Sequence, residues 1–140
     1  MTNNNFEKVP STIAIETSKG VYAIHVYYDG TFEKMGKKLL AHYSKHYSLP
    51  LQITNKGTVV YLGKNLRKYD DDTNVDGTLD LTAYNKEKEP KKVYKTIADL
   101  VQTESKSDYI YLWIKDRWYG MKVEDKKPYL GFFMELKALV

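Results

Sequence analysis

Apolar and polar positions alternate along two stretches of the chain, one near each end. The first stretch covers residues 12–28 and turns at residues 18–20, and the second covers residues 108–123 and turns at residues 115–117. Both are rich in β-branched and aromatic side chains, and a period of two is typical of strands with one buried face. The pattern therefore predicts two β-hairpins.

Between the hairpins the apolar spacing becomes helical. From residue 33 to residue 47 large apolar side chains recur every fourth position, beginning at Met35 and ending at Tyr47. This spacing predicts an amphipathic helix with one face laid on a sheet. Thr31 is suited to cap its start, and Pro50 lies past its expected end.

Three shorter segments complete the expected fold. Residues 59–62 predict a strand, residues 94–102 a second helix, and residues 129–140 a final helix or strand that docks on the core. We therefore predict an α+β fold, in which an antiparallel sheet is covered by one or two helices on one face. The sheet consists of the two hairpins plus extra strands, roughly four to six strands in all.

The length of 140 residues suits a single domain with one core. We expect residues 11–140 to form that domain, with a variable polar insert near residues 64–92 and a disordered or extended arm at residues 1–10. The arm lacks the apolar centre of a signal peptide, and no apolar run reaches the ~20 residues that span a bilayer. We therefore expect a protein of the bacterial cytoplasm that does not bind membranes.

Composition narrows the chemistry further. The chain has no cysteine, which excludes disulfides and thiolate metal sites. Lys and Arg number 22 against 18 Asp and Glu, but only Arg67 and Arg117 are arginine, the residue that nucleic-acid readers favour. The net charge of +4 is therefore mainly a solubility feature. Thirteen tyrosines suit half-buried strand faces and binding surfaces, because each ring has an apolar body and a polar end.

Two parts of the chain carry a spaced pattern that is more specific than composition. It comprises residues 11–16 (Ser-Thr-Ile-Ala-Ile-Glu), 23–25, 28–30, 36, 39–40 and 42–43, and then residues 108–112 and 117–119. In this pattern the chain resembles a family of small, largely uncharacterised proteins of bacteriophages and prophages. The resemblance implies a phage or prophage origin and no particular reaction. Where that family has Cys-His-Trp, this chain has Val26, Tyr27 and Tyr28, so no role of that Cys or His is carried over.

His42 and His46 stand four residues apart, which on a helix places both imidazoles on one face. Two histidines at this spacing hold zinc in some proteases, but such a site needs a third ligand and a Glu base. The residues between them supply no carboxylate, and His25 is the only other histidine. We assign no metal here, and expect either a solvated helix edge or one histidine packed under the sheet.

The acidic stretch around residue 76 has the spacing of a calcium-binding loop. Four side chains match its oxygen-ligand positions: Asp72, Asn74, Asp76 and Asp80. Gly77 matches the glycine of the sharp turn, but Ala83 stands where the loop needs a bidentate Glu. The alternative is an acidic surface loop that leads into a strand at residues 79–84.

The second hairpin interleaves aromatic rings with basic side chains. Trp113 and Trp118 flank a turn that carries Arg117. A row of rings beside cations is able to stack bases or to hold a nucleotide. The same rings are able to form one side of a sheet packed on a helix, the ordinary place for aromatic strands.

A further candidate lies at the end of the first hairpin, where Tyr28, Asp29 and Gly30 follow the strand that contains His25. Functional side chains concentrate in loops held by rigid elements. The alternative is structural, with Gly30 needed for a positive φ and Asp29 capping the turn or the next helix. Both alternatives stay open.

We expect a non-enzymatic protein without a cofactor, because the sequence contains neither a nucleophile–base motif nor a phosphate loop. The leading hypothesis is a phage or prophage accessory protein that binds a host component stoichiometrically as a counter-defence factor. The component is either a host protein or a small nucleotide signal. Its candidate binding residues are His25, Tyr28, Asp29, His42, Trp113, Arg117 and Trp118. The alternatives are a nucleic-acid-binding module built on the second hairpin and a metal-assisted enzyme built on His25 and His42. Pairing of exposed edge strands into a homo-oligomer also fits the pattern.

Overall fold

The computed structural model describes residues 6–68, 76–81, 88–104, 106–124 and 133–140. Within these residues there are nine strands and three α-helices. The strands are β1 (Ser11–Thr17), β2 (Gly20–Val26), β3 (Val59–Tyr61), β4 (Asn65–Lys68), β5 (Gly77–Asp80), β6 (Lys92–Tyr94), β7 (Tyr109–Ile114), β8 (Arg117–Lys122) and β9 (Met134–Glu135). The helices are α1 (Lys37–His42), α2 (Ser48–Asn55) and α3 (Ile97–Thr103), with a π-helical turn (Phe32–Gly36) before α1 and a 3₁₀ turn (Leu136–Ala138) after β9.

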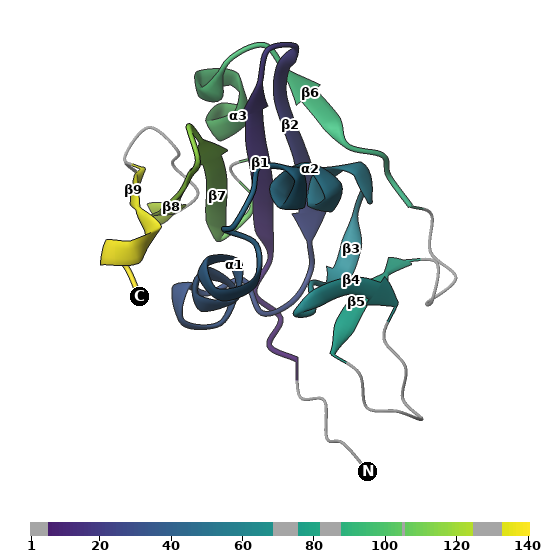
Figure 1. The fold of residues 1–140 in the computed structure, drawn as a ribbon. Coiled ribbons are helices and arrows are strands. Elements are labelled where there is room, and N and C mark those ends of the chain that lie inside the picture. The colour runs from purple at the N-terminus through teal and green to yellow at the C-terminus, as the bar shows by residue number, and fades with distance from the viewer. Residues whose placement is uncertain (1–5, 69–75, 82–87, 105, 125–132) are drawn as a thin grey trace.

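The described strands form one sheet, so the predicted α+β fold is confirmed. Their order is β4-β5-β3-β2-β1-β7-β8-β9, and β6 pairs with β2 as well (Figure 1). Both predicted hairpins are present, as the antiparallel pairs β1–β2 and β7–β8. Strand β1 runs parallel to β7, with Ile13 beside Tyr111, and this pairing places the two hairpins next to each other. The sheet is mostly antiparallel, but it is larger than expected and contains parallel pairs.

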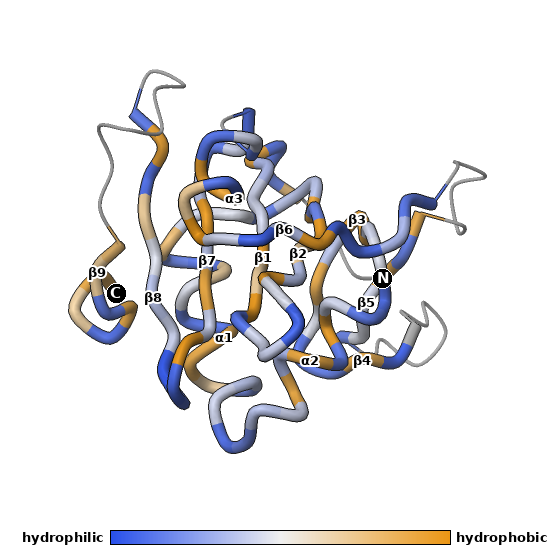
Figure 2. Tube along the Cα trace, turned by 90° about the horizontal axis from the view of Figure 1, so that it is seen from above, coloured by the Kyte–Doolittle hydropathy of each residue, from blue (hydrophilic) through white to orange (hydrophobic). Residues whose placement is uncertain are grey.

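Helices cover both faces of the sheet. Seen from above, α3 lies on one side of the sheet and α1 and α2 lie on the other (Figure 2). Strand β1 is buried on both faces, because Ile13 and Ile15 belong to the cluster beneath α1 and α2 while Ala14 belongs to the cluster beneath α3. This arrangement differs from the single covered face that we expected, since alternation in β1 places apolar side chains on both sides.

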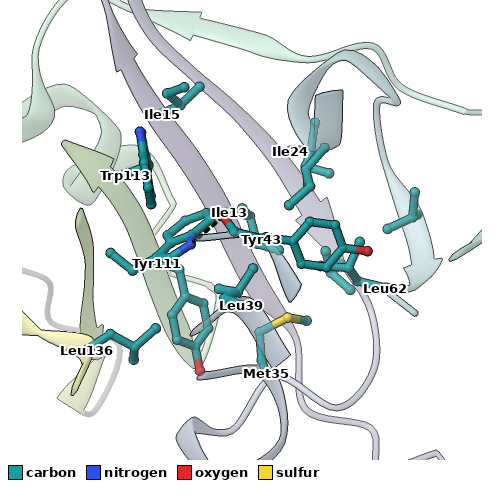
Figure 3. Packing of buried hydrophobic residues seen from close by; sticks show 14 residues of the cluster. Ile13, Ile15, Ile24, Met35, Leu39, Tyr43, Leu62, Tyr111, Trp113 and Leu136 are labelled. Carbon is teal, nitrogen blue, oxygen red and sulfur yellow. Dashed lines mark hydrogen bonds between the residues drawn. The ribbon is translucent and has the colours of Figure 1, made fainter. Parts of the chain in front are cut away.

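The larger core cluster lies between the sheet and α1 and α2 (Figure 3). Its aromatic side chains bury their polar ends against backbone acceptors. The indole N–H of Trp118 donates to the carbonyl of Tyr43 at 3.1 Å, and the Tyr43 hydroxyl donates to the carbonyl of Gly63 at 2.6 Å. Burial raises the pKa of Tyr43 to about 12, so its hydroxyl stays a donor.

The predicted helix over residues 33–47 ends early. After the π-helical turn, α1 stops at His42, and the hydroxyl of Ser44 donates to the carbonyl of Leu39 at 2.9 Å. A second helix, α2, then begins at Ser48 and holds Pro50 in its first turn, where a missing N–H costs little. Tyr47 therefore leaves the apolar stripe, and its side chain is 54% exposed.

Two of the shorter predicted elements are present with slightly different bounds. The strand expected at residues 59–62 is β3. The helix expected at residues 94–102 is α3, which begins only at Ile97 because Tyr94 belongs to β6. Thr96 caps its start, with the side-chain oxygen accepting from the N–H of Asp99 at 3.1 Å.

The buried hydroxyl of Tyr111 generates a first prediction. It donates to the carbonyl of Gly30 at 2.5 Å and so joins β7 to the end of the first hairpin. The Tyr111→Phe variant leaves that buried carbonyl without its donor, and we expect it to lower the free energy of unfolding by about 1–3 kcal/mol in urea denaturation. Tyr119, a half-buried tyrosine in β8, is the matched control, and its Phe variant should change stability by less than about 0.5 kcal/mol. Equal effects of the two changes would contradict the role of the Tyr111–Gly30 bond.

Candidate functional site

The sheet splits beside β2, and the split opens a pocket. Strand β6 pairs with residues 21–23 of β2, whereas β3 pairs with β2 at Val26, so both registers leave out Ile24 and His25. A backbone bond of 2.9 Å from the N–H of Thr58 to the carbonyl of Glu89 joins the segments that lead into β3 and β6. The cavity between them has a volume of about 230 Å³. Its wall is described by these residues: Ala23, Ile24, His25, Tyr27, Thr58, Glu89, Pro90, Lys92, Glu104 and Lys106.

Two of the lining residues, His25 and Glu104, are the visible members of a connected row of polar side chains that lies behind the pocket. The Nδ1 atom of His25 lies 3.4 Å from the hydroxyl of Ser107, which lies 2.7 Å from the hydroxyl of Thr12. Thr12 donates to Oε1 of Glu104 at 3.0 Å, and the hydroxyl of Tyr94 donates to Oε2 of the same carboxylate in a very short bond. The row therefore joins β1, β2, β6 and the segment between α3 and β7.

The charged groups of the pocket are unequally exposed. The side chain of Glu104 is 6% exposed, and the amine of Lys92 lies 3.9 Å from its Oε2. Burial lowers the pKa of His25 below 6.5, Glu104 opposes this shift, and the charges of Lys106 and Lys92 add to it. The ring of His25 is therefore neutral at pH 7. Burial and the bond to Glu104 raise the pKa of Tyr94, so its hydroxyl remains a donor.

This arrangement suits binding better than attack on a substrate. Ser107 is fully buried and its hydroxyl lies within the polar row, so it is not exposed as a nucleophile. The ionisable groups that line the pocket are a neutral imidazole, the amines of Lys92 and Lys106, and the carboxylates of Glu89 and Glu104. They offer hydrogen bonds and charge pairing. The volume lies below the roughly 300–1,000 Å³ of sites for drug-sized ligands, so it suits a single ring or a short polar molecule.

Of the residues predicted from the sequence, His25 is the one that lines this pocket. Asp29 is buried and holds the segment before β1, because its Oδ1 accepts from the N–H of Glu7 at 2.7 Å. Asp29, not Gly30, has the positive φ, of 60°, which corrects the expectation for that turn. Gly30 is needed for space instead, since a Cβ there would lie 2.6 Å from the carbonyl oxygen of Val9. Tyr28 packs its half-buried ring 5.9 Å from that of Phe6.

The histidine pair does not form a metal site. His42 is exposed at the end of α1, whereas His46 follows the helix and its Nδ1 accepts from the N–H of Ser48 at 3.1 Å. His25 shares a face of β2 with Ala23, which belongs to the cluster beneath α3, whereas its neighbour Ile24 belongs to the cluster beneath α1 and α2. His25 and His42 therefore do not meet. Across the ranges that the structure describes, no three His, Asp or Glu side chains gather where a metal ion would fit.

The calcium-loop candidate is only partly described. Asp72 and Asn74 lie outside the described residues. Oδ1 of Asp76 accepts from the hydroxyl of Tyr61 at 2.8 Å, and that hydroxyl also accepts from the amine of Lys38 at 2.9 Å. Asp80 pairs with the amine of Lys88 at 3.4 Å. Asp76 and Asp80 thus have protein partners that join β3, β5 and α1.

The second hairpin places its tryptophans in the core. Trp113 and Trp118 are 3% and 2% exposed, and their rings meet edge to face at 5.4 Å. Rings this deeply buried do not form an exposed platform on which bases would stack, while a binding role of the two tryptophans stays a prediction. Arg117 alone of the three is exposed, and its guanidinium lies 3.5 Å from Oε1 of Glu135.

Sequence reasoning missed the polar row behind His25. Thr12 lies 92 residues from Glu104 and 95 residues from Ser107 in the chain, and neither Glu104 nor Ser107 belongs to a motif. The available signal was weak: Thr12 is a polar residue in an apolar strand, on the opposite face from Ile13. A buried polar side chain in a sheet needs a partner, but the sequence does not reveal which one.

Comparisons of the chain with protein-family models, with curated proteins and with solved structures found no match. The phage resemblance of residues 11–47 and 108–119 therefore stays a prediction. In the described part of the chain no helix has both the length and the apolar character needed to cross a membrane. The function is consequently argued from the pocket itself.

The buried tryptophans generate a second prediction. Trp118→Ala removes a fully buried indole, and we expect a loss of about 3–5 kcal/mol in the free energy of unfolding, measured by urea denaturation. Arg117→Ala, one residue away and exposed, should stay within about 0.5 kcal/mol of the parent. A Trp118→Ala protein as stable as the parent would show that the indole is not part of the core.

The buried histidine generates a third prediction, on pH. Because the pKa of His25 is lower in the folded protein than its ordinary 6.5, the unfolded chain binds more protons once the pH falls below about that value. The stability should therefore be lower at pH 5 than at pH 7.5, and His25→Gln should flatten this slope. The variant His42→Gln, at an exposed site, serves as the control. A slope unaffected by the loss of His25 would disprove its buried, neutral state.

Proposed function

We propose that the protein acts stoichiometrically, by binding a host component, and that the pocket beside His25 is its binding site. The supporting observation is a cavity of about 230 Å³ whose wall combines a neutral imidazole with two lysines at its rim. Among host components, a small nucleotide signal fits this chemistry best. The protein would then be a phage or prophage accessory factor that sequesters the signal of a host defence system.

The nucleotide fits the pocket in two parts. A base is a flat ring of the size that the cavity takes, and Tyr27 and Pro90 offer apolar contact on its wall. The phosphate would lie outside, where Lys92 and Lys106 supply positive charge. Lysine is a common phosphate-binding residue as a point charge. Glu104 is acidic, but the amine of Lys92 lies 3.9 Å from its Oε2, and this cation offsets the repulsion between Glu104 and a phosphate.

The burial of the two tryptophans disfavours the nucleic-acid alternative. It depended on rings of the second hairpin as a stacking platform, and the two tryptophans of that hairpin are buried. The metal-assisted alternative depended on His25 and His42 acting together, and these lie on opposite faces of the sheet.

Calorimetry with a panel of mono- and cyclic nucleotides tests the proposal, together with mass spectrometry of small molecules released by heating protein purified from bacteria. We expect one-to-one binding of a nucleotide. If no nucleotide binds and none is released, the small-ligand proposal fails. A host protein recovered instead by pull-down would move the proposal to the other class of partner.

The role of the rim generates a fourth prediction. Lys92→Glu replaces an attraction to phosphate with a repulsion, which should weaken nucleotide binding by about 1–2 kcal/mol, or roughly 5- to 30-fold. Lys122→Glu is the matched control, because Lys122 is an exposed lysine in strand β8 and is absent from the pocket wall. Equal affinities of the two variants would contradict a phosphate at this rim.

A further inference from the structure

The polar row behind the pocket has a direction that can be derived by counting protons. The carboxylate of Glu104 only accepts, so the single hydroxyl proton of Thr12 is used in the bond of 3.0 Å to Oε1. Thr12 therefore accepts in its bond of 2.7 Å with Ser107, and the single proton of Ser107 is used there. Each step leaves the next group with a free lone pair and no free proton.

The last step fixes the tautomer of His25. Since Ser107 has no proton left to donate, the contact of 3.4 Å between its Oγ and Nδ1 of His25 requires the proton to be on Nδ1. A neutral imidazole has one N–H, so Nε2 carries a lone pair. Burial keeps the ring neutral at pH 7 by lowering its pKa. The ring lines the pocket, and Nε2 is the ring nitrogen that the polar row leaves as an acceptor.

We propose that Nε2 of His25 is the acceptor for an N–H group of the ligand, and that the pocket therefore selects a nucleobase presenting an N–H donor. This inference rests on the proposed function for its ligand, but its structural half concerns the protein alone. The selection is strong when a donor must meet a buried acceptor, because a ligand lacking the donor leaves that acceptor unpaired.

The same acceptor makes binding sensitive to acid. Protonation of His25 converts Nε2 into a donor, which removes the bond to the ligand's N–H. The charged groups that face the ring are Glu104, Lys106, Lys92 and Glu89, two of each sign. Glu104 and Glu89 favour the protonated ring, whereas Lys106 and Lys92 oppose it. Affinity should fall as the pH drops below about 6.5 toward the lowered pKa.

Nuclear magnetic resonance tests the structural half without any ligand. Long-range ¹H–¹⁵N correlation at pH 7.5 reports which ring nitrogen carries the proton, and His25→Gln assigns the signal. We expect the pyridine-type shift on Nε2. Thr12→Val removes the step between Ser107 and Glu104, frees the Ser107 proton and should move the His25 proton to Nε2. Thr54→Val, at another fully buried threonine, in α2, is the matched control and should leave the tautomer unchanged. A proton on Nε2 in the parent protein overturns the inference.

Calorimetry tests the ligand half with defined probes: guanosine and uridine 5′-monophosphates and their N1-methyl and N3-methyl counterparts. The expected result is a loss of at least about tenfold in affinity on methylation, and a further loss for the unmethylated probe between pH 7.5 and pH 5.5. Affinities unchanged by methylation overturn the inference while leaving nucleotide binding intact. No binding of any nucleotide is the separate failure of the proposed function, and the tautomer measured above distinguishes the two.

Discussion

Strand β1 pairs antiparallel with β2 and parallel with β7, and this double pairing joins two hairpins from opposite ends of the chain. Every other part of the structure depends on that junction. On one face it assembles the cluster that α1 and α2 cover, with Ile13 beside Tyr111. On the other face it brings Thr12 of β1 next to Ser107, just before β7. A parallel pair needs a long crossover, and here the crossover carries helices α1 to α3 and strands β2 to β6.

The face beneath α3 also contains a buried carboxylate, which is costly unless it is well bonded. The carboxylate of Glu104 accepts hydrogen bonds from the hydroxyls of Thr12 and Tyr94, and it lies 3.9 Å from the amine of Lys92. These contacts attach the end of α3 to β1 and to β6 at once. Removing one donor would leave the carboxylate short of a partner, which costs more than the bond contributes. Glu104, which lines the pocket, therefore also holds α3 against β1 and β6.

The sequence predicted the parts of the fold that are local. Alternation and turn chemistry were sufficient for both hairpins, since residues 12–16 and 21–28 contain their own pairing signal. The division of one edge of β2 between β3 and β6 was not predictable, because it depends on contacts between distant segments. The apolar period also failed after Tyr43, where the hydroxyl of Ser44 bonds to the backbone and the chain starts a new helix.

The prediction of the site was also limited by contacts between segments that are distant in the sequence. His25 was a candidate because it precedes the Asp-Gly turn. In the structure, Asp29 accepts a hydrogen bond from the segment before β1, whereas His25 lines the pocket. Trp113 and Trp118 looked like a surface because rings and cations alternate, but period two places rings on one face, and that face is the core. Residue type was therefore sufficient to select candidate side chains, but the three-dimensional surroundings of each side chain determine its role.

The hydrogen bonds of Glu104 and the hydrogen-bonding character of the pocket cannot be changed independently. The row that ends at His25 begins at a carboxylate that has no proton to give, so the direction of every bond follows from the ionised state of Glu104. To present a donor instead of an acceptor at His25, every bond of the row would have to reverse, and a carboxylate at the far end of the row does not allow this because it only accepts. The amine of Lys92 lies 3.9 Å from the same carboxylate. A buried charge that stabilises the junction of β1 with α3 thereby also sets the hydrogen-bonding character of the pocket.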